Sequence, residues 1–374
     1  MDVSFNEQER MLQERAREFL EREVPLDMVR DMEEDDRGYP VDLWRKLAGL
    51  GWLGIAFPNE YGGEGWRFMD LVIVAEEMGR VLAPTPFLAT VVLGGLTVLD
   101  GGDEEQKQRV LPAIAKGELV MTAAYLEPNR PNIGYGDREL ASTAQLRGDS
   151  YVLNGEKHFA QYAHVADVIL TLARDEASGE AVWLLVDGGS EGIDVTPVST
   201  TGGDHQCHVT FRDTPVPAAN RLPGDGWPVL ERTLQRAAVA TCGFAAGAAN
   251  KVLEFTVEYA RTRVQFGRPI ATFQAVRHRC ADMAVEVDGA RFITYEAAWG
   301  LSEGIPSEME VSVAKAYVSD AVREVMAHGH QVHGAIGFSE EHPMPLYSRR
   351  AKMTEAMFGN ANLHRERVAE RLGL

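Results

Sequence analysis

Cysteine is scarce in this sequence, and the ligand spacings of common metal sites are missing. There are three cysteines, Cys207, Cys242 and Cys280. Their odd number argues against a disulfide framework, and the lack of a Cys-x-x-Cys spacing argues against a zinc site. The histidines between 328 and 342 lie on a segment broken by glycine, without a His-Glu-x-x-His pattern. No Gly-x-x-x-x-Gly-Lys phosphate loop is present. We therefore expect neither a metal centre nor a P-loop nucleotide site.

Positive charge is also in short supply. The chain has 37 Lys and Arg against 56 Asp and Glu, a net charge of −19, which argues against nucleic acid or an anionic membrane as a partner. The longest uncharged run, from Ala237 to Asn250, is too short to span a bilayer. The first residues lack the basic and apolar regions of a signal peptide. These features, with the few cysteines, lead us to expect a cytoplasmic protein with a solvated acidic surface.

Apolar periodicity divides the chain into three parts. Residues 1–120 show helical spacing, as in Phe19 and Leu20 among charged neighbours. Residues 121–222 contain short β-type runs closed by prolines, and we expect a small β-domain there. Within it, the pair Asn154-Gly155 predicts a hairpin turn. Residues 223–374 are helical again, with helices expected near 227–260, 271–300, 307–333 and 345–357.

Two motifs in the C-terminal part identify a family. The run Gln-Val-His-Gly-Ala-Ile-Gly-Phe covers residues 331–338, and Arg-Ala-Lys-Met-Thr-Glu-Ala-Met-Phe-Gly-Asn covers residues 350–360. Together they resemble the C-terminal signature of the acyl-CoA dehydrogenases, with Ala335 where the family has a second glycine. The resemblance extends over essentially the whole chain. It implies an N-terminal helical domain, a middle β-barrel and a C-terminal four-helix bundle, so a mainly α fold with a central β-domain.

A further motif of the family lies earlier in the chain: Arg-Val-Gln-Phe-Gly-Arg-Pro-Ile from Arg263, followed by Phe273 and Gln274. An arginine at a helix end next to a glycine suits a pyrophosphate, because the guanidinium offers forked donors and glycine lets the backbone approach. By resemblance, Arg263, Phe266 and Gln274 contact an FAD bound mainly by the neighbouring subunit.

The same resemblance places a second group of residues on that neighbouring flavin. Gln331, Gly334 and Gly337 would line its adenosine end. An ordinary surface salt bridge at Arg263 and simple helix stops at the glycines are the plainer interpretation, which we rank below the cofactor.

The catalytic position is the point at which the sequence departs from the family. The family's base is the Glu of a Tyr-Glu-Gly-Thr turn, and that position falls on Phe358. A benzyl side chain accepts no proton. Some branches place the base before an arginine on the first C-terminal helix, where this chain has Gln235, an amide. Glu355, three residues before Phe358, is a weak candidate for a displaced base, and an exposed helix carboxylate is the favoured explanation of it.

Family contacts to the flavin ring are altered as well. A Thr-Glu-Pro sequence normally opens the β-domain, and Leu126 stands in place of that threonine. No serine follows where the family has Gly-Ser-Asp. A Met-Trp-Ile-Thr run is replaced by His-Phe-Ala-Gln, so Phe159 could stack on a ring and Gln161 could donate a hydrogen bond.

We interpret the chain as the base-lacking, non-catalytic subunit of a heterotetrameric (α2β2) acyl-CoA dehydrogenase. It would share FAD with a homologous catalytic subunit, which desaturates an acyl-CoA at α,β and passes electrons to an electron-transfer flavoprotein. A bulky steroid side-chain CoA is a substrate that the resemblance suggests.

Two alternatives stay open. One is a self-sufficient homotetrameric flavoenzyme, with Glu355 as a displaced base or with base-free chemistry such as monooxygenation. The other is a flavin-free structural or acyl-CoA-binding protein.

Overall fold

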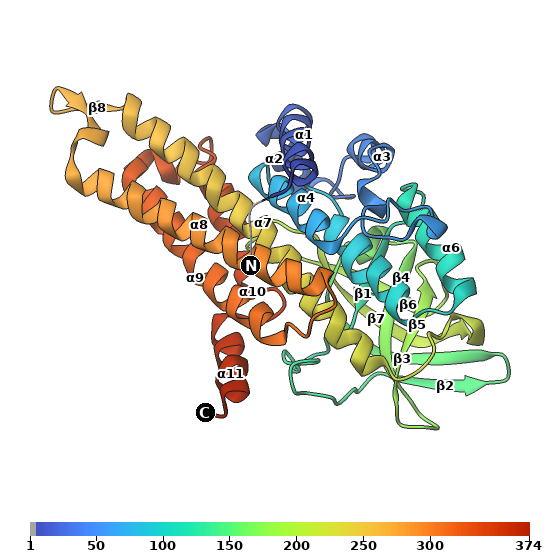
Figure 1. Ribbon diagram of the computed structural model, residues 1–374. Coiled ribbons are helices and arrows are strands. Elements are labelled where there is room, and N and C mark those ends of the chain that lie inside the picture. The colour runs from blue at the N-terminus through green and yellow to red at the C-terminus, as the bar shows by residue number, and fades with distance from the viewer. Residues whose placement is uncertain (1–4) are drawn as a thin grey trace.

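The chain folds as helices, then strands, then helices. The structure is a computed structural model that describes residues 5–374 (Figure 1). The first helical part consists of α1 (Glu7–Glu23), α2 (Leu26–Glu34), α3 (Val41–Gly49), α4 (Phe68–Arg80), a π-helix (Leu88–Gly95), α5 (Leu96–Gly101) and α6 (Glu104–Ala115), with short 3-10 turns at Trp52–Gly54 and Asn59–Tyr61.

The central part is one curled sheet of seven strands. The strands are β1 (Met121–Ala124), β2 (Thr143–Arg147), β3 (Ser150–Gln161), β4 (Val168–Asp175), β5 (Ala181–Asp187), β6 (Ile193–Val198) and β7 (Gln206–Pro217). Their order is β1-β4-β2-β3-β7-β6, with β5 attached to β4. β4 pairs in parallel with β1 and β2, while its pairing with β5 is antiparallel. The expected middle β-domain is present in this form.

The central strands are apolar along their whole length because both faces of the sheet are buried. On β4, Leu170 and Leu172 belong to the main core shared with the helices, whereas Ile169 and Ala173 belong to a second core on the opposite face of the sheet. Successive side chains of a strand point to opposite faces, so a strand buried on both faces has no polar side.

The prediction of a turn at Asn154-Gly155 is wrong. β3 continues through both residues, and its register against β7 shifts between Leu153 and Gly155, which is a β-bulge. Asn154 holds the bulge: its side chain donates to Asp213 Oδ1 at 3.1 Å and accepts from the Asp213 amide at 2.8 Å. The hairpin between β2 and β3 instead turns at Gly148, where φ is +61°. Asn and Gly occur both in turns and in β-bulges, so the local sequence does not distinguish a bulge from a turn.

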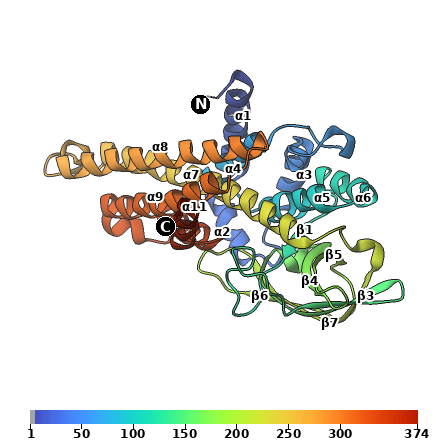
Figure 2. The same ribbon diagram turned by 60° about the horizontal axis from the view of Figure 1, so that its bottom comes forward.

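The second helical part begins with α7 (Gly226–Thr262) and continues with α8 (Gln274–Ser302), α9 (Glu308–His333), α10 (Met344–Ala356) and α11 (Ala361–Leu372). A short hairpin of β8 (Val264–Gln265) and β9 (Arg268–Pro269) joins α7 to α8. α7 to α10 agree with the four predicted segments to within a few residues, and α11 matches none of them. The hairpin lies at the end of the bundle farthest from the sheet (Figures 1 and 2).

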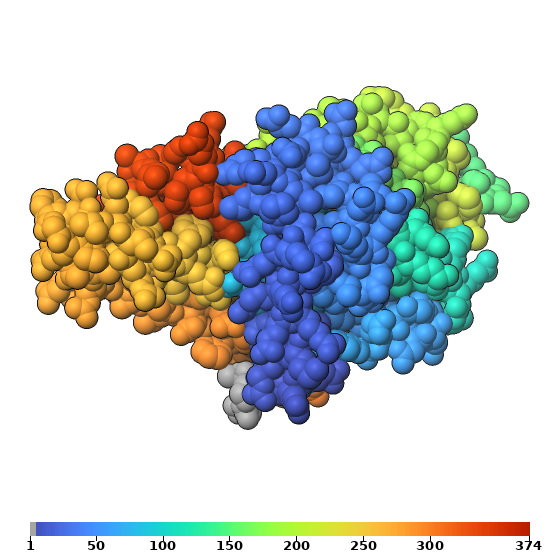
Figure 3. Space-filling view, turned by 90° about the horizontal axis from the view of Figure 1, so that it is seen from above, coloured from blue at the N-terminus to red at the C-terminus, as the bar shows by residue number. Residues whose placement is uncertain are grey.

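Close contact between α4 and α7 joins the two helical parts. A Cβ at Gly79 would lie 1.9 Å from the Phe244 carbonyl oxygen, and one at Gly247 would lie 1.8 Å from the Glu76 carbonyl oxygen. Only glycine allows backbones to approach so closely. From above, the N-terminal helices cover the region between the bundle and the sheet (Figure 3).

Among the described residues, none of the helices combines the length and apolar character needed to cross a membrane.

A buried ion pair fixes the start of the β-domain. Lys157 Nζ lies 2.7 Å from Glu127 Oε1, with side-chain exposures of 0% and 1%. Glu127 also accepts from the amides of Ala141 and Ser142 at 2.7 and 3.0 Å. These bonds keep the pKa of Glu127 below its usual value despite the opposing effect of burial. The carboxylate is therefore charged and fully paired.

Removing the cation should leave that charge buried without its counter-ion. We expect Lys157→Met to lower the free energy of unfolding by about 3 kcal/mol in urea titrations. The control is Arg45→Met, which breaks an exposed pair with Asp42 (72% and 87% exposed) and should change stability by less than about 0.5 kcal/mol. Equal effects of the two substitutions would contradict this role of the pair.

Candidate active site

The turn between α10 and α11 holds Phe358 in a fixed but unfavourable conformation. Its φ is +55°, and that of Gly359 is +87°. A left-handed backbone costs a bulky residue of the order of 1–2 kcal/mol, so it needs support from its surroundings. Tyr135 Oη donates to the Phe358 carbonyl at 2.7 Å, and His364 Nε2 approaches the same oxygen at 2.8 Å. Because a carbonyl only accepts, Nε2 carries the proton.

The Phe358 side chain lines a cavity of about 700 Å³ between the sheet and α10. Among the described residues, two carboxylates line this cavity, Glu127 and Asp204. Glu127 is held by Lys157, as described above. Asp204 lies on the loop between β6 and β7 and accepts from Thr200 Oγ1 at 2.7 Å. At the turn, the side chain that lines the cavity is the benzyl group of Phe358.

The other two candidate base positions do not line this cavity. Glu355 is on α10, pairs with Lys352 at 3.0 Å and borders a small void of about 10 Å³ beside the buried Lys315. Gln235 is half-buried on α7 and lines neither this cavity nor that void. A proton transfer needs hydrogen-bond reach, and neither residue faces the space beside Phe358.

A bulge in β3 presents Phe159 to the cavity. The register against β7 shifts between Lys157 and Ala160, and Phe159 has φ +57° and is 50% exposed. Bulges commonly redirect a side chain in this way. Gln161 also lines the cavity, and its amide contacts Met357 Sδ at 3.6 Å. Leu126 adds an apolar surface where a hydroxyl would be needed to bond a ring.

The predicted cofactor-binding residues lie elsewhere, at the far end of the bundle. Arg263 follows α7 and begins the β8–β9 hairpin, whose two-residue turn is Phe266-Gly267 with φ of +54° and +76°. Positive φ at both positions is typical of a type I′ hairpin turn. Phe266 is 91% exposed, and Arg263 and Gln274 are exposed as well. Within residues 5–374 Arg263 forms no ion pair, so its guanidinium is available to an anionic group such as a pyrophosphate.

The second predicted group lies at the same end. Gln331 is exposed near the end of α9, and Gly334 ends that helix with φ +64°. Gly337 is buried, and a Cβ there would lie 3.0 Å from the Cβ of His333. Arg279 of α8 contacts His328 Nδ1 at 2.9 Å, which ties the start of α8 to the end of α9. Tertiary structure thus brings both motifs to one end and separates them from the cavity.

Several residues of the site were not anticipated from the sequence. Asp204 follows two glycines in a loop, and this local sequence gives little indication that the carboxylate lines a cavity. Arg350, buried on α10, donates to the Gly202 carbonyl, and Tyr135 reaches Phe358 across 223 positions. Nothing local marks such long-range partners. Among the described residues, no cluster of three metal-ligating side chains occurs.

This arrangement, a curled sheet between helical parts with a cavity where they meet, is that of flavoprotein oxidoreductases. Models of the acyl-CoA dehydrogenase N-terminal, middle and C-terminal domains match residues 6–118, 130–214 and 224–373. The chain is 30% identical over 384 residues to the probable acyl-CoA dehydrogenase YngJ of Bacillus subtilis, with 100% of each chain covered. The chain belongs to the acyl-CoA dehydrogenase family, whose members bind FAD.

Two solved structures of named assemblies are similar to this chain. One is the ChsE4-ChsE5 complex from Mycobacterium tuberculosis, with a TM-score of 0.91 at 30% identity and coverage of 100% of this chain and 99% of that one. The other is a variant of the Tcur3481-Tcur3483 steroid ACAD, with a TM-score of 0.87 at 28% identity and 98% coverage of both chains.

Acid should loosen the turn at Phe358 through His364. Burial lowers the pKa of this histidine to about 4, against about 6.5 in an unfolded chain. Between these values the unfolded state binds more protons, so stability falls as the pH drops. We expect His364 to account for a loss of about 2 kcal/mol between pH 6.5 and 5.

The measurement is urea unfolding at several pH values for the wild type and for His364→Gln, which keeps a donor and cannot titrate. The wild type should lose more stability in acid than the variant does. Parallel pH profiles would show that His364 is not the group responsible.

Proposed function

We propose that this chain is the base-lacking subunit of a heteromeric FAD-dependent acyl-CoA dehydrogenase. A homologous partner would carry the base and desaturate an acyl-CoA at α,β, and electrons would pass to an electron-transfer flavoprotein. The observation that carries the proposal is Phe358: the turn is held by two hydrogen bonds, yet it presents hydrocarbon to the cavity.

The reaction explains why this matters. Desaturation removes a proton from the α-carbon as the β-hydride leaves, and the flavin, when bound, supplies the hydride acceptor. A positioned base contributes about 10²–10⁴ in rate. Of the carboxylates lining the cavity, Glu127 is held in a buried ion pair, and Asp204 accepts hydrogen bonds from Thr200 and Gln206. This chain's own cavity therefore lacks a base at the family's position.

The exposed residues at the far end of the bundle support the proposal that FAD is shared with a neighbouring chain. Arg263 and Phe266 are exposed, and the hairpin that carries them lies at the end of the bundle farthest from the sheet (Figure 1). An exposed arginine beside an exposed aromatic ring suits a ligand held by a neighbouring molecule. Within this chain's cavity, Leu126 removes a hydroxyl donor, while Phe159 still offers a ring surface. These residues fit a flavin that lies between two chains better than one enclosed by this chain.

The names of the similar structures are consistent with such an assembly. ChsE4-ChsE5 is a complex of two differently named proteins, and Tcur3481-Tcur3483 is called a steroid ACAD. Steroid side-chain CoA thioesters are therefore the substrate class we propose for the complex, with a cytoplasmic location. We propose an α2β2 stoichiometry, in which a two-fold axis relates two such pairs.

The first test is flavin content and activity. Produced alone, the chain should be colourless and inactive; co-produced with its catalytic partner, it should give one FAD per pair of chains and acyl-CoA-dependent reduction of an electron acceptor. Flavin absorbance against protein concentration gives the stoichiometry. Yellow, active protein from this chain alone would overturn the proposal and favour the self-sufficient homotetramer. A colourless complex would favour a flavin-free binding protein.

The second test addresses the hairpin. In the complex, Arg263→Ala should weaken FAD binding about tenfold or more, because one charge-assisted contact is lost. The measurement is FAD retention in equilibrium dialysis, with Arg323→Ala as control. Arg323 is exposed on α9 and pairs with Asp320 of its own chain at 3.2 Å, so its loss should leave retention unchanged. Equal retention in both variants would remove Arg263 from the flavin site.

A further inference from the structure

The cavity beside Phe358 has a wall that is mostly hydrocarbon where it is buried. Among the described residues, the buried side chains that line it are those of Leu93, Ala123, Tyr125, Glu127 and Phe358. Only Tyr125 and Glu127 have polar side-chain atoms, and Glu127 is fully paired, as described above. The cavity has a volume of about 700 Å³, which is enough for a drug-sized ligand. Tyr125 therefore decides which polar group a ligand can bury there.

Tyr125 places an unpaired phenol at this cavity. The residue directly follows β1 and is 7% exposed. Within residues 5–374 its hydroxyl has no hydrogen-bond partner, and its oxygen is not sealed off from open space. Burial raises the pKa of Tyr125 above its usual value, so the phenol keeps its proton. The wall thus offers a neutral donor without an acceptor, and a ligand that accepts from it removes the cost of leaving it unpaired.

The charged side chains of the cavity are poorly suited to an anionic ligand. Among the described residues, the Lys and Arg side chains that line it are those of Arg130 and Lys352. Arg130 binds Asp137 and Glu139 at 3.1 and 2.5 Å, and Lys352 lies 3.0 Å from Glu355. The phosphates of CoA and the pyrophosphate of FAD would therefore meet only cations that are already paired. Burying a charge without a counter-ion is costly, so an uncharged ligand is favoured.

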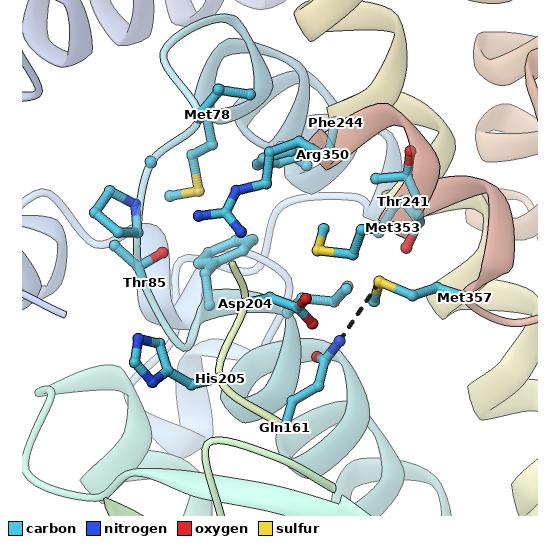
Figure 4. Close-up of a pocket in the computed structure, with 18 of the residues that line it drawn as sticks. Met78, Thr85, Gln161, Asp204, His205, Thr241, Phe244, Arg350, Met353 and Met357 are labelled. Atoms are coloured by element: carbon cyan, nitrogen blue, oxygen red, sulfur yellow. Dashed lines mark hydrogen bonds between the residues drawn. The ribbon is translucent and has the colours of Figure 1, made fainter. Parts of the chain in front are cut away.

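The hydrogen-bonding groups of the wall favour a ketone over an alcohol. A carbonyl oxygen accepts from Tyr125 and brings no proton, whereas a hydroxyl that accepts from it must also find an acceptor for its own proton. Gln161 Nε2 is a second donor, with only the weak sulfur acceptor of Met357 at 3.6 Å (Figure 4). The Asp204 carboxylate already accepts hydrogen bonds from two neighbouring side chains.

We propose that this cavity binds an uncharged, largely apolar ketone, with Tyr125 as the donor to its carbonyl oxygen, in place of an acyl-CoA or a flavin. The inference does not depend on the proposed function, because such binding requires neither a partner nor turnover. It gives a ligand to a cavity that has a hydrocarbon side chain at the family's base position. A steroid ketone is a suitable probe, because its fused rings are apolar and carry no charge.

The test is equilibrium dialysis of the full-length chain against androstenedione and against androstene, the hydrocarbon with the same ring system. The ketone should bind about tenfold more tightly, which is the gain from one hydrogen bond to a buried donor. Tyr125→Phe keeps the ring and removes the hydroxyl. It should lower the affinity for androstenedione about tenfold and leave the affinity for androstene unchanged. Butyryl-CoA and FAD should bind the same chain more weakly than androstenedione does.

A matched control is available in the N-terminal part of the chain. Tyr39 is also 7% exposed, and its hydroxyl has no hydrogen-bond partner within residues 5–374. It lines neither this cavity nor the smaller pocket of Figure 4. Tyr39→Phe should therefore leave both affinities unchanged. Melting temperatures at or above that of the wild type show that both variants are folded.

Four results would overturn the inference. They are the absence of saturable androstenedione binding, equal affinities for androstenedione and androstene, an effect of Tyr125→Phe no larger than that of Tyr39→Phe, and tighter binding of butyryl-CoA or FAD than of the ketone.

Discussion

The Phe358 carbonyl accepts hydrogen bonds from Tyr135 and His364, and these two bonds define the active-site turn. They act on the backbone, so they hold the left-handed conformation whatever side chain is attached. The turn geometry and the chemistry at the turn are therefore determined separately. A change of side chain at position 358 would alter the chemistry offered to the cavity without changing where the side chain points, so the turn does not depend on the group that it carries.

The residues of the candidate site are also divided between two distant parts of the molecule. The cavity is built where the sheet meets α10, and the exposed hairpin lies at the opposite end of the bundle (Figure 2). Two parts of one proposed flavin site that lie so far apart can act together only if a second chain bridges them. Under the proposed function, the chain offers exposed groups to a neighbour at one end of the bundle and has a hydrocarbon side chain at the Phe358 turn of its own cavity.

Local sequence predicted the regular elements well, because periodicity records which face of a helix is buried. The long helices α7 and α9 were expected to within a few residues. Irregular backbone was harder. The Asn154-Gly155 pair forms a bulge held by Asp213, a partner 59 positions away. Whether such a pair turns or bulges depends on the neighbouring strand, which the local sequence does not specify.

The sequence by itself determined the family, the order of helices and strands, and the hydrocarbon side chain at position 358. These follow from residue type and spacing, which are properties of the chain alone. Only the tertiary structure decided that Glu355 lies outside the cavity, that Asp204 lines it, and that Arg263 and Gln331 lie at the same end of the bundle. Such facts depend on which distant segments pack together, and packing results from burying the whole core at once.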